Sequence, residues 1–225
     1  MAAAADKVAP FDSGVRALQG RSNTFIAREG LPFIAAAVVA VWVAAYYLGL
    51  AWAAVPAAVL VVLYLVFRDP RRAVPSVPLG VVSPVDGRVK SVELADKAVL
   101  QGEAHVIRIG IDALGTYTAR CPVEGKIMDI GTAAAQQVTD YRTNALWVRT
   151  DESDDVVLQF GGYRFGLAPL SFNRFGERLG QGQRCAYLRL ARYAEVHLPI
   201  DSKVLAEPGQ RVEAGADLIA KLPHP

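Results

Sequence analysis

Few side chains in this sequence combine a reactive type with a setting that favours chemistry. His197 lies in a segment of alternating apolar and polar residues, where an imidazole with a pKa of about 6.5 could act as a base or could be a structural or solvated group. Asp86 directly precedes Gly87, a position at which an aspartate either shapes a tight turn or takes part in catalysis. Arg164 and Arg174 could bind a phosphate, or they could be solvated surface cations. These residues are candidates that do not by themselves define a reaction.

The composition excludes several functional classes. The 225 residues carry 24 Lys and Arg against 22 Asp and Glu, a net charge of +2, so we expect no nucleic-acid partner. Hydrophobic residues make up 52% of the chain, which excludes a disordered or collagen-like protein. Cys121 and Cys185 match no metal-ligand spacing, so the sequence predicts neither a metal site nor a disulfide framework.

The elements that must position these residues begin with a long apolar run. No charged residue occurs between Glu29 and Arg68. A spanning helix needs about 20 apolar residues, so this run is too long for one straight helix and fits two short ones. Gly49 near its middle, followed by Pro56, predicts a hairpin whose tip lies near 49–52. The alternatives are a buried helical pair in a soluble fold and a single tilted span.

The charges on either side of the apolar run predict its orientation. Arg21 and Arg28 precede the run, and Arg68, Arg71 and Arg72 follow it. Positive charge on both sides favours both ends on the cytoplasmic face. We therefore expect a protein of the cell inner membrane whose remaining domain lies on the cytoplasmic face.

The chain divides into four parts. We predict an N-terminal cytoplasmic segment at 1–29, a membrane hairpin of two short helices at 30–67, a proline-containing linker at 68–80 and a β domain at 81–225. Short alternating segments separated by glycines predict that this last part is mainly β.

A faint internal repeat supports this fold class. Pro-Val-Asp-Gly-Arg-Val at 84–89 is echoed by Pro-Val-Glu-Gly-Lys-Ile at 122–127, and each indicates a strand entry, a tight turn at the glycine and a second strand. Such repeats are typical of a sandwich of short strands with pseudo-symmetric halves. The predicted fold is therefore mainly β, preceded by an α-helical membrane hairpin.

Three stretches of the chain resemble the short bacterial and archaeal type of phosphatidylserine decarboxylase. They are Ala-Arg-Glu-Gly-Leu-Pro-Phe at 27–33; Phe-Arg-Asp-Pro-Arg-Arg at 67–72 with Val-Ser-Pro-Val-Asp-Gly-Arg-Val at 82–89; and Arg-Cys-Pro-Val-Glu-Gly-Lys at 120–126 with Val-His-Leu-Pro at 196–199 and Gly-Gln-Arg-Val-Glu-Ala-Gly at 209–215. They occur in the family's order and at its spacing. The resemblance implies a decarboxylase-like β sandwich and a membrane-bound lyase that converts phosphatidylserine to phosphatidylethanolamine and carbon dioxide.

The resemblance also implies a particular chemistry. Family members are made as proenzymes in which a Gly-Ser bond near the C-terminus cleaves itself, aided by an Asp and a His, and the Ser becomes a pyruvoyl group. That ketone forms a Schiff base with the substrate amine and takes up the electrons released on decarboxylation.

The sequence departs from the family at the residues that carry this chemistry. Asp86 takes the position of the family's Asp, but Tyr117 takes the position of its His, and a phenol with a pKa of about 10 is a poor base at neutral pH. His197 replaces a residue that is often Tyr in the family. The family's Gly-Ser falls on Ala191 and Arg192, and the chain contains no Gly-Ser dipeptide. Because no hydroxyl stands at the cleavage position, we predict no pyruvoyl group and no other cofactor.

The leading interpretation of these departures is an uncleaved pseudoenzyme that binds lipid or assists another enzyme. In it Arg192 is a fixed cation that pairs with Asp86 or with a lipid phosphate or carboxylate. Arg164 and Arg174 are candidate further contacts to the lipid. The expected partners are a membrane phospholipid, another membrane lipid enzyme, or a second copy of the chain in a homo-oligomer.

Two other functions stay open. One is an active phospholipid-modifying enzyme, either a decarboxylase or a related lyase, that uses a rearranged site. Its candidate polar cluster is Asp86, Tyr117, Arg192 and His197, whose spacing identifies no reaction. The other is a structural membrane scaffold without a lipid pocket, for which substitution of Arg192 or Asp86 would leave function intact.

Overall fold

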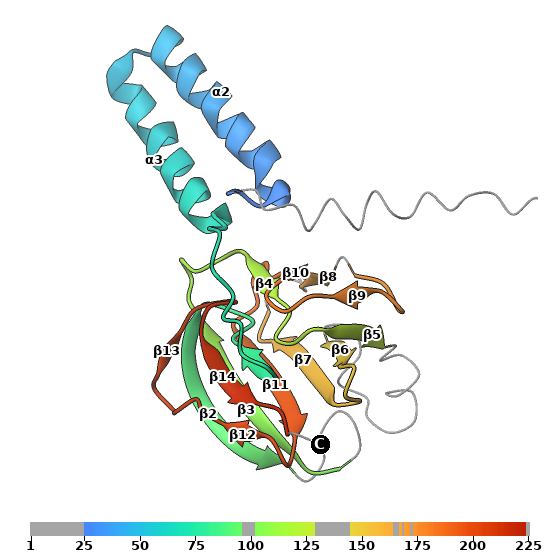
Figure 1. Ribbon diagram of the computed structural model, residues 1–225. Helices are drawn as coiled ribbons and strands as arrows, with labels where there is room; N and C mark the ends of the chain where they lie inside the picture. Colours follow the sequence, from blue (N-terminus) through green and yellow to red (C-terminus); the bar gives the residue numbers. More distant parts are fainter. Residues whose placement is uncertain are drawn as a thin grey trace, which may run out of the picture.

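The protein consists of a helical hairpin joined to a β domain (Figure 1). The computed structural model describes residues 25–95, 102–128, 145–163, 167, 169–171 and 173–223. Strands dominate the part of the chain after residue 80, and two apolar helices precede it. The predicted fold class, mainly β with an α-helical hairpin in front, is confirmed.

The two helices have the length and composition of membrane spans. Helix α2 covers Leu31–Tyr47 and α3 covers Leu50–Phe67, and a short 3-10 helix, η1, precedes them at Arg28–Gly30. Between the two helices Gly49 adopts a φ of +92°, a conformation that favours glycine, and it forms the tip of the hairpin. Large apolar side chains are exposed on both helices, and little of either span is buried within the molecule. A helix that is apolar on all sides is stable in lipid, which associates this hairpin with a membrane.

One large antiparallel sheet forms the body of the β domain. Its eight strands lie in the order β13 (Arg211–Val212), β2 (Gly87–Ala95), β3 (Ala104–Ile111), β11 (Tyr193–Pro199), β7 (Asp155–Gly161), β6 (Ala145–Arg149), β5 (Gly125–Met128) and β9 (Arg178–Leu179). Along β11 the side chains of Ala194, Val196 and Leu198 are fully buried in the core. The alternation in the sequence therefore identifies the core face of this strand correctly.

Two small antiparallel sheets complete the β domain. One has the order β1 (Gly80–Val82), β14 (Leu218–Lys221), β12 (Lys203–Val204); the other has the order β4 (Thr118–Arg120), β10 (Arg184–Tyr187), β8 (Leu170–Ser171). Strands β4, β10 and β8 lie at the end of the domain nearest to the helices, whereas β12 lies at the far end (Figure 1).

The repeated Pro-Val-x-Gly sequence has a clear structural counterpart. Both glycines begin a strand of the large sheet, Gly87 in β2 and Gly125 in β5. A Cβ atom at Gly87 would lie 1.9 Å from the Gly110 carbonyl oxygen, and one at Gly125 would lie 2.3 Å from the Arg149 carbonyl oxygen. Each glycine is therefore required because a neighbouring strand approaches its backbone too closely for a side chain.

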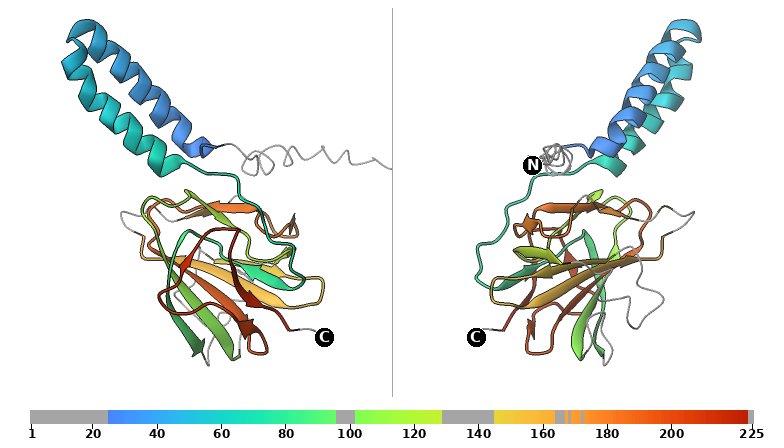
Figure 2. Two further views of the ribbon diagram at one scale, coloured as in Figure 1. Left: turned by 60° about the vertical axis from the view of Figure 1, so that its left-hand side comes forward. Right: turned by 90° about the vertical axis from the view of Figure 1, so that its right-hand side faces the viewer.

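The linker after the hairpin is fastened to the β domain rather than loose. It leaves α3 and runs along the outside of the domain before β1 begins (Figure 2). Asp69 is fully buried, where it pairs with Arg184 at 2.8 Å and with Arg120 at 3.3 Å and accepts a hydrogen bond from the Thr118 hydroxyl. The two chain segments that flank the hairpin are also joined, since the Ala27 N–H donates to the Phe67 carbonyl at 2.8 Å.

Candidate functional site

The candidate site is a cavity of about 460 Å³ where the hairpin meets the β domain. Its walls are the loop after β3 at 111–117 and the turn between β10 and β11 at 188–192. Val66, from the last turn of α3, contributes a third wall. The turn at 188–192 contains the position that the family resemblance assigns to the self-cleaving serine.

The carboxylate of Asp86 is fully occupied by donors from the protein itself. Arg72 in the linker donates to both oxygens, at 2.7 and 2.9 Å. The backbone N–H groups of Thr116 and Ala214 donate to it at 2.9 and 2.7 Å. A carboxylate has about four lone-pair sites, and these four donors use them all. Asp86 therefore joins three chain segments and has no free lone pair with which to accept a proton from a nucleophile.

One expected ion pair is corrected by this arrangement. Arg192 was expected to pair with Asp86 or with a lipid anion, and in the structure Asp86 pairs with Arg72 instead. Glu213 also approaches Arg72, at 3.1 Å. Among the described residues no carboxylate pairs with Arg192.

Tyr117 is held as a neutral hydrogen-bond donor. Its hydroxyl donates to Glu29 Oε2 at 2.7 Å, and its ring packs against Phe67 with the centroids 4.7 Å apart. Burial raises the pKa of this phenol well above its ordinary value, and the hydrogen bond to Glu29 adds to the shift. A phenol in this state cannot replace the histidine base of the family.

Arg189 completes this contact between the hairpin entrance and the β domain. Its guanidinium donates to Glu29 Oε1 from Nη2 at 2.7 Å and from Nε at 3.1 Å. Arg189 also adopts a φ of +50°, which is uncommon for a residue other than glycine, asparagine or aspartate. The charge-assisted bond from the Arg189 side chain to Glu29 helps to stabilise this backbone conformation of the turn beside the cavity.

Arg192 lies exposed at the rim of the cavity. Its position is fixed by the backbone, because its N–H donates to the Gly161 carbonyl at 3.0 Å and its carbonyl accepts from the Ile111 N–H at 2.9 Å. The cavity wall also contains Thr116, whose hydroxyl is buried and has no hydrogen-bond partner among the described residues. A cation on a fixed backbone beside a buried hydroxyl can bind an anionic, oxygen-rich group.

The other predicted site residues lie away from this cavity or outside the described chain. His197 is buried in β11 opposite Val106 and Val157, and its Nε2 lies 3.8 Å from Glu195 Oε2. Arg174 is exposed in the segment just before β9. Arg164 lies outside the described residues. The structure therefore does not bring His197 together with Asp86, Tyr117 and Arg192.

Sequence reasoning missed three residues that shape the site. Glu29 and Arg189 hold Tyr117, and Arg72 holds Asp86. Glu29 and Arg72 flank the apolar run and belong to stretches that carry the family resemblance, but the sequence assigns neither of them a contact in the site. Because Glu29 and Arg189 are 160 positions apart in the chain, no local pattern could have joined them.

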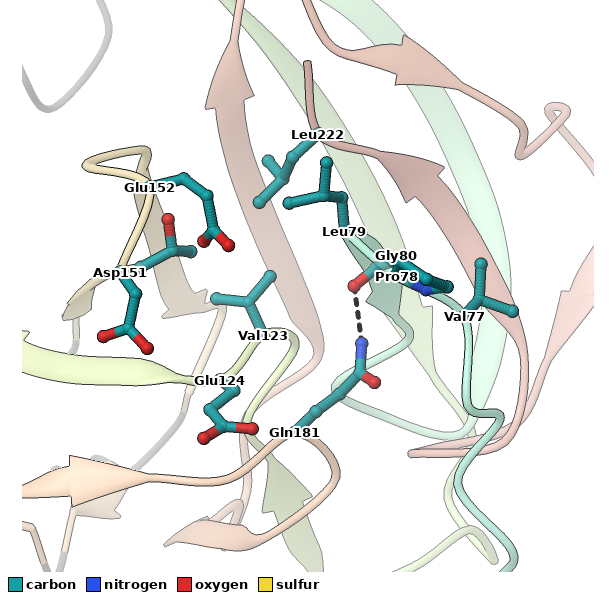
Figure 3. A pocket seen from close by; sticks show the side chains of 11 residues that line it. Val77, Pro78, Leu79, Gly80, Val123, Glu124, Asp151, Glu152, Gln181 and Leu222 are labelled. Atoms are coloured by element: carbon teal, nitrogen blue, oxygen red, sulfur yellow. Dashed lines mark hydrogen bonds between the residues drawn. The ribbon is translucent and has the colours of Figure 1, made fainter. Parts of the chain in front are cut away.

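A second cavity, of about 290 Å³, contains none of the predicted site residues. Figure 3 shows the carboxylates of Glu124, Asp151 and Glu152 on one side of it and the 77–80 segment on the other. Arg178 pairs with Glu124 at 3.1 Å and with Asp151 at 2.5 Å. An acidic wall disfavours an anionic lipid, so we do not assign the family's ligand to this cavity.

Comparison with curated proteins identifies the family. A relative from Nitrosomonas eutropha named phosphatidylserine decarboxylase proenzyme is 32% identical over 208 residues, which cover 88% of this chain and 96% of that protein. A proenzyme of the same name from Burkholderia cenocepacia is 34% identical over 211 residues, which cover 89% and 97%. The chain belongs to the phosphatidylserine decarboxylase family. The resemblance seen in the sequence is confirmed, and the family is one of carboxy-lyases in phospholipid metabolism.

The two other comparisons add little. No protein-family model matches the chain. A solved structure, glucose permease IIA from Mycoplasma capricolum, covers 63% of this chain with 16% identity and a TM-score of 0.43, a likeness too low to carry an argument. The hydrogen bonds from Arg72, Thr116 and Ala214 give Asp86 a structural role.

Proposed function

We propose that this family member is an uncleaved, membrane-anchored pseudoenzyme that binds an anionic phospholipid at the cavity beside α3. The observation that carries the proposal is the composition of one cavity: it is lined both by Val66 of an apolar span and by the exposed Arg192. An acyl chain favours the first surface and a phosphate or carboxylate favours the second. Few ligands other than a lipid headgroup with its attached chains match both.

The proposal that no pyruvoyl group forms rests on the hydroxyls near the former cleavage position. That position is Arg192, preceded by Ala191, and neither side chain can attack a backbone carbonyl. Two hydroxyl groups line the cavity. The Tyr117 hydroxyl is bound to Glu29, and Thr116 belongs to the loop after β3, not to the former cleavage position between β10 and β11. The residues present do not fit the family's cofactor.

The separation of the candidate polar groups is a reason to prefer lipid binding over a rearranged active site. The carboxylate of Asp86 is saturated, Tyr117 is neutral, and His197 lies in the interior of β11 away from the cavity. Proton transfer needs a base with a free lone pair near the reacting group. Asp86 has no such lone pair, the neutral hydroxyl of Tyr117 is too weak a base, and His197 does not line the cavity.

The membrane and the orientation are also part of the proposal. The arginines on both sides of the apolar run favour a hairpin whose two ends lie on the cytoplasmic face of the inner membrane. The β domain then contacts the cytoplasmic leaflet, and another membrane lipid enzyme or a second copy of the chain could receive or present the bound lipid.

Intact-mass measurement on the purified full chain tests the absence of self-cleavage. We expect one species at the full-length mass of 24.1 kDa. Two fragments, with a ketoacyl group at the start of the smaller one, would refute the pseudoenzyme proposal.

Lipid analysis of the same preparation tests the binding site. We expect an anionic phospholipid to be retained by the wild-type chain and the Arg192→Gln variant to retain about tenfold less, the equivalent of one lost charged contact of about 1.4 kcal/mol. Arg174→Gln is the matched control, because it removes an exposed arginine that does not line the cavity. Equal retention by Arg192→Gln and the control would exclude this cavity as the lipid site.

A further inference from the structure

We propose that the β domain docks on an anionic lipid surface by inserting Leu114 and Leu190 into the bilayer next to the hairpin. Leu114 belongs to the loop after β3 and Leu190 to the turn between β10 and β11. The proposal concerns how the domain contacts the membrane, and it does not depend on whether the cavity holds a lipid.

Contacts with the end of α3 place both leucines at the level where the hairpin leaves the membrane. Arg68, the first residue after α3, donates from Nη2 to the Leu114 carbonyl at 3.2 Å. Leu190 lines the same cavity as Val66 of α3. The loop of Leu114 leads within three residues to Tyr117, whose ring packs on Phe67. These segments therefore adjoin the membrane boundary, because they touch the last turn of a membrane span.

The exposure of the two leucines is unfavourable in water and favourable at a bilayer. The exposed fraction of Leu114 is 56% and that of Leu190 is 46%. Both lie in turns that connect strands of the β domain. Apolar side chains near a bilayer surface bind by entering the boundary between the headgroups and the acyl chains. Because the neighbouring helix α3 spans the bilayer, a lipid surface is the partner that lies within reach of these two leucines.

The charges around these loops favour an anionic surface. Arg28, Arg68 and Arg192 are exposed on the hairpin ends and the cavity rim. The nearby carboxylates are already paired: Glu29 binds Arg189, and Asp112 lies 3.5 Å from Arg211. Each basic residue near a membrane surface strengthens binding to anionic lipid, an effect that salt weakens.

Depth-dependent fluorescence quenching on the full chain in vesicles tests this docking. Single cysteines replace Leu114 or Leu190 and carry an environment-sensitive dye, and brominated lipid acts as the quencher. The native Cys121 and Cys185 do not interfere, because both are fully buried and burial raises the pKa of the Cys185 thiol. The vesicles contain phosphatidylcholine either alone or mixed with phosphatidylglycerol.

Leu94→Cys is the matched control. Leu94 has an exposed fraction of 54% and lies at the far end of β2, paired with His105, whereas Gly87 at the near end pairs with Ile111 beside the cavity. Figure 1 shows that end of β2 pointing away from the helices. We expect brominated lipid to quench about half or more of the emission at 114 and 190 and about a tenth or less at 94, with stronger quenching in the anionic vesicles.

Two results would overturn the docking proposal. Quenching at 114 and 190 that is no greater than at 94 would show that the loops stay in water. Equal quenching in neutral and anionic vesicles would refute the anionic surface. The label at 114 separates docking from the cavity proposal, because Leu114 does not line the cavity, whose own measure is the lipid retained by Arg192→Gln.

Discussion

At the scale of single residues, Asp86 shows how neighbours decide the task of a side chain. The family position of this residue suggests catalysis, and its position before Gly87 suggests a turn. The sequence alone left both open. Four donors around the carboxylate, two of them from Arg72, favour the structural task. The sequence could not decide because those donors come from three distant segments of the chain.

Substitution of Asp86 by Asn should therefore reduce stability. Asn cannot balance the charge of Arg72, whose side chain is only 16% exposed, so we expect the free energy of unfolding to fall by about 2–3 kcal/mol. Thermal denaturation in detergent measures the effect. The control is Arg178→Gln, which breaks ion pairs of a side chain that is 58% exposed and should cost less than about 1 kcal/mol. An unchanged melting temperature for Asp86→Asn would contradict the structural role of the Asp86 carboxylate.

Tyr117 predicts a specific dependence on alkaline pH. Burial raises the pKa of Tyr117 in the folded state, so its contribution to stability is fully present below the unfolded value of about 10 and is lost as the pH rises above it. The Tyr117→Phe variant lacks this group. We expect it to be less stable than wild type by about 1 kcal/mol at neutral pH and to lose stability less steeply above a pH of about 10.

Denaturant unfolding between neutral and alkaline pH measures this difference. Tyr163→Phe, in which the substituted tyrosine is 40% exposed, is the control and should follow the wild-type curve. Parallel curves for wild type and Tyr117→Phe above the unfolded pKa would show that Tyr117 titrates as it does in the unfolded chain.

At the scale of elements, the linker after α3 is the part that departs most from its sequence description. Three prolines at 70, 75 and 78 indicated a linker, but its first residues are among the most firmly held in the protein. Asp69 is fully buried between Arg120 and Arg184, and Arg72 is bound to Asp86. Burial raises the pKa of Asp69 and lowers that of Arg184, whereas their mutual attraction acts in the opposite direction for both.

Asp69→Asn should be more damaging than the loss of an exposed ion pair. It removes the carboxylate that the buried Arg120 and Arg184 share, and we expect a cost of about 3–5 kcal/mol. Melting temperature and yield of folded protein in detergent provide the measurement. The matched control is Asp155→Asn, since Asp155 also binds an arginine, Arg149, but with its side chain 31% exposed. Similar losses for the two variants would contradict the role of the buried cluster.

The regular elements were accessible from the sequence for simple reasons. In lipid, the backbone N–H and C=O groups of the uncharged run must bond to each other, and two helices separated at Gly49 achieve this. The alternation in 193–198 and the paired Pro-Val-x-Gly sequences follow from the two-residue period of strands and from close strand contacts at Gly87 and Gly125. Long-range ion pairs leave no such periodic trace.

At the scale of the whole molecule, the β domain and the hairpin form one connected structure. Glu29 binds Arg189, the backbones at Ala27 and Phe67 are joined, and Asp69 is buried in the domain. The cavity lies at this junction. A lipid bound there, as proposed, would contact both parts at once.

The shortness of the two spans has a mechanical consequence. Helices of 17 and 18 residues are about 26 and 27 Å long, slightly less than a typical hydrocarbon core of about 30 Å. A span shorter than the hydrocarbon core is accommodated by local thinning of the bilayer around it. Because ion pairs of Glu29 and Asp69 fasten both ends of the hairpin to the β domain, such thinning would bring the lipid headgroups closer to the domain.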